Sequence, residues 1–126
     1  MPVAFIGAGL QMRRRAPVIV QSPDYMLVEV VGTGAVPKDL VTSFGAEICT
    51  DWRHAVERDD VDIIVVCTPP HNHAEITIAA LESGKHVLCE KPLCRTVAEA
   101  EAMVAAASRS KRLLKCGFNH RHHPAI

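Results

Sequence analysis

The first residues of this sequence that could bind a ligand are two glycines near the N-terminus. Gly7 and Gly9 follow the apolar run 3–6 and precede an amphipathic segment that begins at residue 10. Glycine permits a tight turn and lets a pyrophosphate approach the bare backbone amides at the start of a helix. The pattern predicts a dinucleotide-binding loop made of Gly7, Gly9, Leu10, Gln11 and Met12.

This loop departs from the usual fingerprint at its last position. A Gly or Ala normally stands there, because the helix must pack closely on the strand, whereas this sequence has Met12. We expect the larger side chain to push the helix outward or to rotate it. Because glycines also follow strands in ordinary turns, the loop alone is weak support for nucleotide binding.

The residues after the valine-rich run 25–31 bear on the choice between NAD and NADP. An Asp or Glu at this point would hydrogen-bond to the ribose 2′-hydroxyl of NAD, but the sequence has Gly32, Thr33 and Gly34. Thr33 leaves room for a 2′-phosphate, which Lys38 is near enough in sequence to approach. The expected cofactor is NAD or NADP, with a slight preference for NADP. The alternative is an unspecific loop with Lys38 in solvent.

A third candidate loop follows the apolar run 63–67. Thr68 offers a hydroxyl at the end of a strand, and Pro69 and Pro70 fix the backbone beside it. His73 stands where the next helix is expected to begin. Both a ligand contact and an ordinary helix start are compatible with this histidine.

A fourth candidate loop is the sequence Glu90-Lys91-Pro92, which comes directly after an apolar run. It would place an ammonium group at the mouth of a sheet. Such a lysine can polarise the oxygen of a substrate or help to move its proton. On physical grounds alone, a surface salt bridge is the alternative.

Short apolar runs alternate with amphipathic segments along the whole chain. Strands are expected over 3–6, 25–31, 47–49, 63–67, 86–89 and 113–117, and helices over 10–21, 37–44, 51–56, 71–83 and 96–108. Repeated strand–helix–strand units predict an α/β fold, a doubly wound parallel sheet with helices on both faces. In such a sheet the four candidate loops all lie at the carboxyl ends of strands, where ligands bind.

The composition limits the class of protein. At 126 residues the chain has room for one domain, placed over 1–126. Its 14 basic and 14 acidic residues cancel, so no nucleic acid and no anionic membrane is expected as a partner. No apolar stretch is long enough to span a bilayer. Five cysteines without CxxC spacing indicate a reducing cytoplasm.

Two short runs of basic residues could suggest a binding role, which we do not assign. The basic run 13–15 is expected to be a solvated helix turn. The run 120–123, His-Arg-His-His, could suggest a metal site. Adjacent side chains on an extended chain point to opposite sides, however, so no metal ligands are predicted.

Five motifs follow one another along the chain at defined spacing. They are Gly7-x-Gly9, Asp62 leading to Thr68-Pro69-x-x-x-His73, Ala80-Leu81-x-x-Gly84-Lys85-His86-Val87, Glu90-Lys91-Pro92 and Asn119-His120-Arg121-x-x-Pro124. In this order and spacing the chain resembles the Gfo/Idh/MocA oxidoreductases over essentially its whole length. The string from Gly84 to Pro92 is far more specific than the glycine loop.

The resemblance implies an N-terminal Rossmann domain that binds NAD or NADP. It also implies a C-terminal domain that holds the substrate, a sugar, a polyol or a related carbonyl compound. Lys91 would be the catalytic residue of this half, at the nicotinamide and the substrate. Residues 68–73 and 90–92 would line the cofactor, and Arg121 would reach the nicotinamide side. The family's further acid–base residues belong to the second domain, which this chain is expected to lack.

Two functions therefore stay open. The first is the nucleotide-binding domain of such an oxidoreductase, inactive alone, because hydride transfer needs cofactor and substrate in near contact with water excluded. The second is a stand-alone NAD(P)-binding, interaction or sensor module without turnover. Apolar surface left by a missing second domain predicts self-association as a homodimer.

Overall fold

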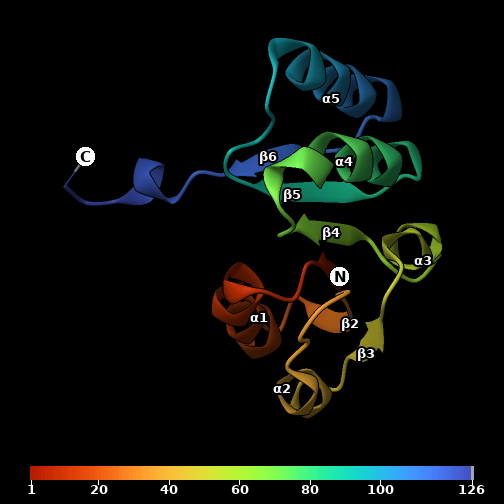
Figure 1. Ribbon diagram of the computed structural model, residues 1–126, viewed down its shortest axis with the longest axis vertical. Helices are drawn as coiled ribbons and strands as arrows, with labels where there is room; N and C mark the ends of the chain where they lie inside the picture. The colour runs from red at the N-terminus through yellow and green to blue at the C-terminus, as the bar shows by residue number, and fades with distance from the viewer. Residues whose placement is uncertain (126) are drawn as a thin grey trace.

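The computed structural model describes residues 1–125, so Ile126, the last residue of the predicted domain, lies outside the described residues. Six parallel strands form one sheet in the order β3-β2-β1-β4-β5-β6 (Figure 1). The strands are β1 (Pro2–Ile6), β2 (Met26–Val31), β3 (Glu47–Cys49), β4 (Ile63–Val66), β5 (His86–Glu90) and β6 (Leu114–Gly117). The order reverses between β1 and β4, which is the topological switch point of a doubly wound sheet.

Helices cover both faces of this sheet, as predicted. They are α1 (Leu10–Gln21), α2 (Lys38–Ser43), α3 (Trp52–Glu57), α4 (His73–Glu82) and α5 (Val97–Ser110), with short 3-10 turns η1 (Pro70–Asn72) and η2 (Asn119–His122). One buried apolar cluster joins α1 and α2 to the sheet. A second, larger cluster joins α3, α4 and α5 to it. The doubly wound Rossmann-like fold is therefore confirmed.

Local sequence explains where several elements begin and end. The Asp51 side chain caps α3 by accepting a hydrogen bond from the Arg53 backbone N–H at 3.0 Å. The Thr96 hydroxyl caps α5 in the same way, accepting from the Glu99 N–H at 3.1 Å. These side chains satisfy amides that a helix start leaves free. Gly84 follows α4 with a φ of +82°, a conformation that favours glycine.

The predicted boundaries differ from the observed ones by a few residues. The helix expected from residue 71 begins at His73, because Pro70–Asn72 forms a separate 3-10 turn. Strand β5 continues through Glu90, so the charged motif begins inside the sheet rather than after it. Within residues 1–125, no helix has the length and hydropathy needed to span a bilayer.

Candidate functional site

An open cavity of about 510 Å³ lies at the carboxyl ends of the strands. It is lined by residues 6–9 after β1, 31–35 after β2 and 67–69 after β4, together with Thr50, Trp52, Asn72 and Ile76. The cavity therefore extends across the switch point between β1 and β4. Among the described residues that line it, none carries a charged side chain.

The glycine loop shapes the centre of this cavity through its backbone. Gly7 has a φ of +109°, and a Cβ there would lie 2.6 Å from the carbonyl atoms of Cys67. A side chain at Gly9, in contrast, would meet no heavy atom within 4 Å. Gly9 is also the N-cap of α1 and supplies no side-chain hydrogen bond to the helix. Open space in front of uncapped helix amides fits a bound pyrophosphate.

The other three predicted residues of this loop have side chains that lie outside the cavity. Met12 is fully buried in the apolar cluster beneath α1. Leu10 is 59% exposed, and Gln11 borders a separate groove formed with Arg14 and Val18. Any contact of Leu10, Gln11 or Met12 with a ligand in the cavity would therefore be made by backbone N–H groups. The expectation that the Met12 side chain pushes α1 outward or rotates it remains a prediction.

The end of β2 lines the cavity with small residues. A Cβ at Gly32 would lie 2.7 Å from a Val36 methyl group and 2.8 Å from the Ala8 Cβ, so the chain is tightly packed there. Thr33 lines the cavity, whereas Lys38, the first residue of α2, is exposed and lies outside the lining. The structure thus places Thr33 at the predicted site but does not bring Lys38 to it.

The loop after β4 is tied to the loop after β5 by one buried imidazole. His73 is only 1% exposed, its Nδ1 lies 2.8 Å from the Pro92 carbonyl oxygen, and its Nε2 lies 2.7 Å from that of Thr68. Thr68 and Pro69 line the cavity, but Pro70 and His73 do not. His73 is thus both the first residue of α4 and a bridge between two candidate loops.

Thr68 leaves one polar atom unsatisfied beside the cavity. Its buried hydroxyl oxygen has no hydrogen-bond partner among the described residues. A buried polar atom without a partner costs about 1–3 kcal/mol. A polar ligand that reaches this hydroxyl would remove the cost, so Thr68 fits the nucleotide site that its position predicts.

Glu90 faces the interior of the domain. It is 4% exposed, and its carboxylate pairs with the Arg15 guanidinium of α1. The Arg15 Nη2 also donates to Asn119 Oδ1 at 3.0 Å. The prediction that the whole run 13–15 is a solvated turn is therefore wrong for Arg15, because a buried carboxylate requires a nearby cation.

Lys91 remains exposed next to this buried pair. Within residues 1–125 it has no ion-pair partner, so the alternative of a surface salt bridge between Glu90 and Lys91 is excluded. Glu90, Lys91 and Pro92 lie outside the cavity lining. Arg121 is exposed in η2, on the C-terminal segment that runs away from the sheet in Figure 1, and is not brought to the cavity.

The cysteines near the site are expected to be unreactive thiols. All five are free. Burial raises the pKa of Cys67, which lines the cavity, from 9.0 to about 12, and it raises the pKa of Cys89 to about 12 as well. Both are therefore neutral thiols at neutral pH, which argues against a nucleophilic role.

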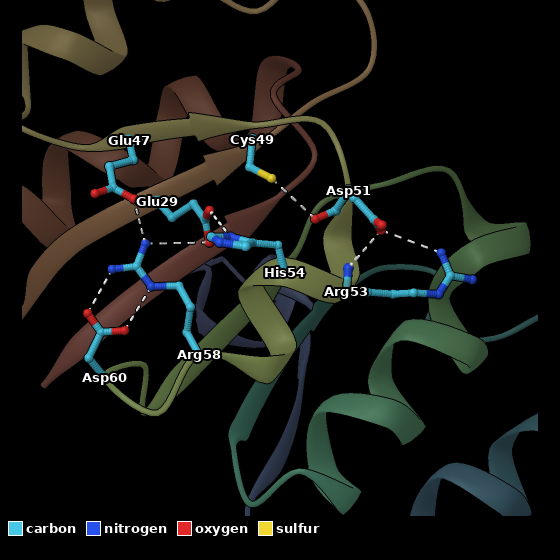
Figure 2. A network of polar contacts seen from close by, with 8 residues as sticks. All are labelled: Glu29, Glu47, Cys49, Asp51, Arg53, His54, Arg58 and Asp60. Carbon is cyan, nitrogen blue, oxygen red and sulfur yellow. Dashed lines mark hydrogen bonds and ion pairs between the residues drawn. The ribbon is translucent and has the colours of Figure 1, made fainter.

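A charged network lies where α3 meets β2 and β3 (Figure 2). Its centre is Glu29, 1% exposed, whose Oε1 contacts His54 Nδ1 at 2.7 Å. Arg58 Nη1 lies 3.8 Å from the other Glu29 oxygen and 2.9 Å from Glu47. The Arg58 guanidinium also hydrogen-bonds to Asp60 and holds the pKa of that carboxyl below its ordinary value.

Part of this network resembles a set of metal ligands. Ligand atoms of Glu29, Cys49 and His54 lie within 4.8 Å of one another. The buried Glu29 carboxylate already has the Arg58 guanidinium 3.8 Å from one oxygen and the His54 imidazole 2.7 Å from the other, however. The network is therefore an intramolecular cluster of charged and polar side chains, and we assign no metal to it.

The chain matches the GFO_IDH_MocA model, described as an oxidoreductase family with an NAD-binding Rossmann fold, over residues 1–118. It therefore belongs to this family, and the resemblance drawn from its motifs is confirmed. The chain is an NAD(P)-binding Rossmann domain of the Gfo/Idh/MocA oxidoreductases.

Individual relatives agree with this assignment. Levoglucosan dehydrogenase from Pseudarthrobacter phenanthrenivorans is 45% identical over 84 residues, 66% of this chain and 22% of that protein. The 3-ketoreductase KijD10 from Actinomadura kijaniata, solved with NADP and TDP-benzene, is 35% identical, with a TM-score of 0.89 over 98% of this chain and 39% of its own. GenD2 from gentamicin A biosynthesis, solved with NAD, is 34% identical, with a TM-score of 0.93 over 98% of this chain and 36% of its own. The chain thus spans less than half of each relative.

Several cavity residues were not among the predicted site residues. They are Ile6, Ala8, Val31, Gly32, Gly34, Ala35, Thr50, Trp52, Cys67 and Ile76, whereas Asn72 lies within the predicted range 68–73. Thr50 and Trp52 follow the short strand β3, which the sequence did predict. The rule that ligands bind at the carboxyl ends of strands would have pointed to both, had it been applied to this edge strand.

Proposed function

We propose that this chain is the nucleotide-binding domain of an NAD(P)-dependent oxidoreductase acting on a sugar, a polyol or a related carbonyl compound. The observation that carries the proposal is the uncharged cavity across the switch point, with the uncapped start of α1 at its centre. Bound NAD(P) supplies the hydride acceptor for an oxidation or the donor for a reduction. The names of two relatives, a levoglucosan dehydrogenase and a 3-ketoreductase, support this substrate class.

The chain's own residues would divide the binding work between backbone and side chains. Gly7 allows the turn to pass close to the Cys67 backbone, and Gly9 leaves open space at the start of α1, so that the amides of residues 10–12 would donate to the pyrophosphate. Thr33 and Thr68 offer hydroxyls on either side of that point. Pro69 and Pro70 hold the backbone of the second hydroxyl in place.

Lys91 would act on the substrate as the catalytic residue of this domain. Pro92 follows Lys91, and His73 links Pro92 to Thr68, which lines the cavity. This link would keep the lysine loop beside the site. The exposed ammonium group would donate a hydrogen bond to the substrate oxygen and help to move its proton. Glu90 would position this lysine through its buried pair with Arg15, and Arg121 would approach from the C-terminal segment.

NADP is the cofactor that the end of β2 favours. Thr33 stands where a carboxylate would repel a 2′-phosphate, and the described lining of the cavity contains no acidic side chain. The exposed Lys38 would have to turn toward the site to contribute. One similar structure holds NADP and another holds NAD, so both cofactors occur among relatives of this fold.

We further propose that the chain alone lacks turnover and associates as a dimer in the cytoplasm. Only Lys91 is assigned a direct action on the substrate, and it is exposed to water, which hydride transfer must exclude. Leu113 and Phe118, which flank the edge strand β6, are 73% and 49% exposed, and this is apolar surface that a second copy would cover. Five free cysteines support a reducing compartment.

Titration with NADH and NADPH, followed by nicotinamide fluorescence, tests the cofactor claim. Saturable binding of at least one is expected, and binding of neither would overturn the proposal.

Incubation with polyols and either oxidised cofactor should give no NAD(P)H; steady turnover would show that the chain is active alone. Light scattering should report a dimer, and a monomer at high concentration would contradict self-association. A chain that binds but acquires no turnover with any substrate domain would instead be a stand-alone module.

A further inference from the structure

Trp52 is an aromatic side chain in an otherwise small and polar part of the cavity. It is the only tryptophan of the sequence and, among the described residues that line the cavity, the only aromatic one. It is the first residue of α3 and follows Asp51, the cap of that helix. Its side chain is half-buried, so part of the ring packs on the protein and part remains available to a ligand.

The ring packs against the larger apolar cluster and is contacted by an arginine of its own helix. The Arg53 guanidinium lies 4.5 Å from the centre of the Trp52 ring, and its Nη2 lies 3.6 Å from a Glu75 carboxylate oxygen on α4. The helix that carries Trp52 is itself tied to β2, because His54 contacts the buried Glu29 (Figure 2). A ring held in this way needs little further ordering when a planar ligand binds, which lowers the entropic cost of binding.

The topology indicates which part of a dinucleotide Trp52 would meet. The start of α1 at Gly9 takes the pyrophosphate, and the end of β2 at Thr33 takes the ribose that is attached to adenine. Trp52 follows β3, the strand on the far side of β2 from β1. It therefore lies toward the adenosine end of the cavity, whereas Lys91 follows β5, on the other side of the switch point.

We infer that Trp52 is the contact surface for the adenine ring of the bound dinucleotide. This inference rests on the proposed function and assigns the adenosine subsite within it. Stacking on an aromatic ring does not depend on charge, which fits a cavity lined without charged side chains. Alanine substitution of a stacking aromatic typically weakens binding of a base by about tenfold or more.

Ligands that contain only one half of the cofactor test this subsite separately from the rest of the cavity. Because Trp52 is the single tryptophan, its fluorescence reports on its own surroundings. ADP-ribose and 2′-phospho-ADP-ribose should change the Trp52 emission in a saturable way, whereas nicotinamide mononucleotide should leave it unchanged. An emission change with nicotinamide mononucleotide alone would overturn the inference.

Calorimetry on variants gives the second, independent readout. Trp52→Ala should weaken binding of ADP-ribose by about tenfold, and Trp52→Phe, which keeps an aromatic ring, should retain most of the affinity. If the alanine variant does not fold, Trp52→Leu keeps the apolar packing and should show the same loss. Equal affinity of a folded Trp52→Ala or Trp52→Leu variant for ADP-ribose would overturn the inference, while NADPH or NADH binding to the wild type would still support the proposed function. Absence of any dinucleotide binding to the wild-type chain would overturn both.

Discussion

The two halves of the sheet differ in what their strand ends carry. In the half formed by β1, β2 and β3, the strand ends supply glycines, a threonine and an indole to the cavity, and the charges lie around Glu29, outside its lining. In the half formed by β4, β5 and β6, the end of β4 supplies Thr68 and Pro69 to the cavity, and the end of β5 carries charge outside the lining, as the buried Glu90–Arg15 pair and the exposed Lys91. In the function that we propose, the first half binds the dinucleotide through backbone and stacking, and the second contributes Lys91 to the chemistry.

The largest expected effect is on the first half, at Gly7. Gly7→Ala places a Cβ against the Cys67 backbone in a positive-φ conformation, and it should destabilise the fold by roughly 3 kcal/mol. Gly9→Ala is the matched control, because its Cβ meets open space. Urea denaturation of both variants measures the difference. Equal stability of Gly7→Ala and wild type would contradict the backbone description of this half.

In the second half, the corresponding change is electrostatic. Glu90→Gln keeps the shape of the side chain but leaves the partly buried Arg15 without its anion, and it should lower the unfolding free energy by about 2 kcal/mol. Lys91→Met, at the exposed neighbour, should change it by less than about 0.5 kcal/mol. Thermal and urea denaturation compare the two. A larger loss for Lys91→Met than for Glu90→Gln would reverse the roles that we assign.

A charge introduced into the uncharged half should alter cofactor choice. Thr33→Glu would place a carboxylate beside the expected 2′-phosphate, and it should lower the NADPH-to-NADH affinity ratio by roughly tenfold. Thr33→Gln, of the same size but neutral, serves as the control. Paired titrations of the three proteins measure the ratio. If glutamate and glutamine shift it equally, the effect is steric and the preference for NADP is unsupported.

The smallest effect on stability is expected in the charged network around Glu29 and Arg58. The Arg58 guanidinium lowers the pKa of Asp60 below its ordinary value of 3.8, so the pair stabilises the fold above that pH and stops doing so as the pH falls through the lowered pKa. Asp60→Asn should therefore cost a little stability near neutral pH and nothing in strong acid. Urea denaturation across the acid range tests this. A cost independent of pH would point to lost packing instead.

Much of this fold follows from short-range chemistry and was therefore predictable. β1 and β4 are continuously apolar, as buried parallel strands are, and Asp51 and Thr96 cap helices through bonds to residues two and three positions away. The paired role of Arg15 was not predictable in this way. It depends on a contact with Glu90, 75 residues distant, that only the folded sheet creates.

The same distinction applies to the candidate site. Gly7, Gly9, Thr33, Thr68 and Pro69 were predicted from motifs and do line the cavity. Trp52 was missed because no motif marks it and because the rule that ligands bind at the carboxyl ends of strands was not applied to the edge strand β3. His73 was noticed, but its bridge to Pro92 depends on two loops meeting in space.

The most direct test of the nucleotide-binding assignment is calorimetry of NADPH and NADH with the wild-type chain and with Gly9→Val. A Cβ at Gly9 would meet no heavy atom within 4 Å, so we expect Gly9→Val to fold, but valine would occupy the position expected for the pyrophosphate. We predict one-to-one binding of at least one dinucleotide by the wild type and loss of that binding in a Gly9→Val variant that still folds. Binding of equal strength to both proteins, or to neither, would contradict the assignment.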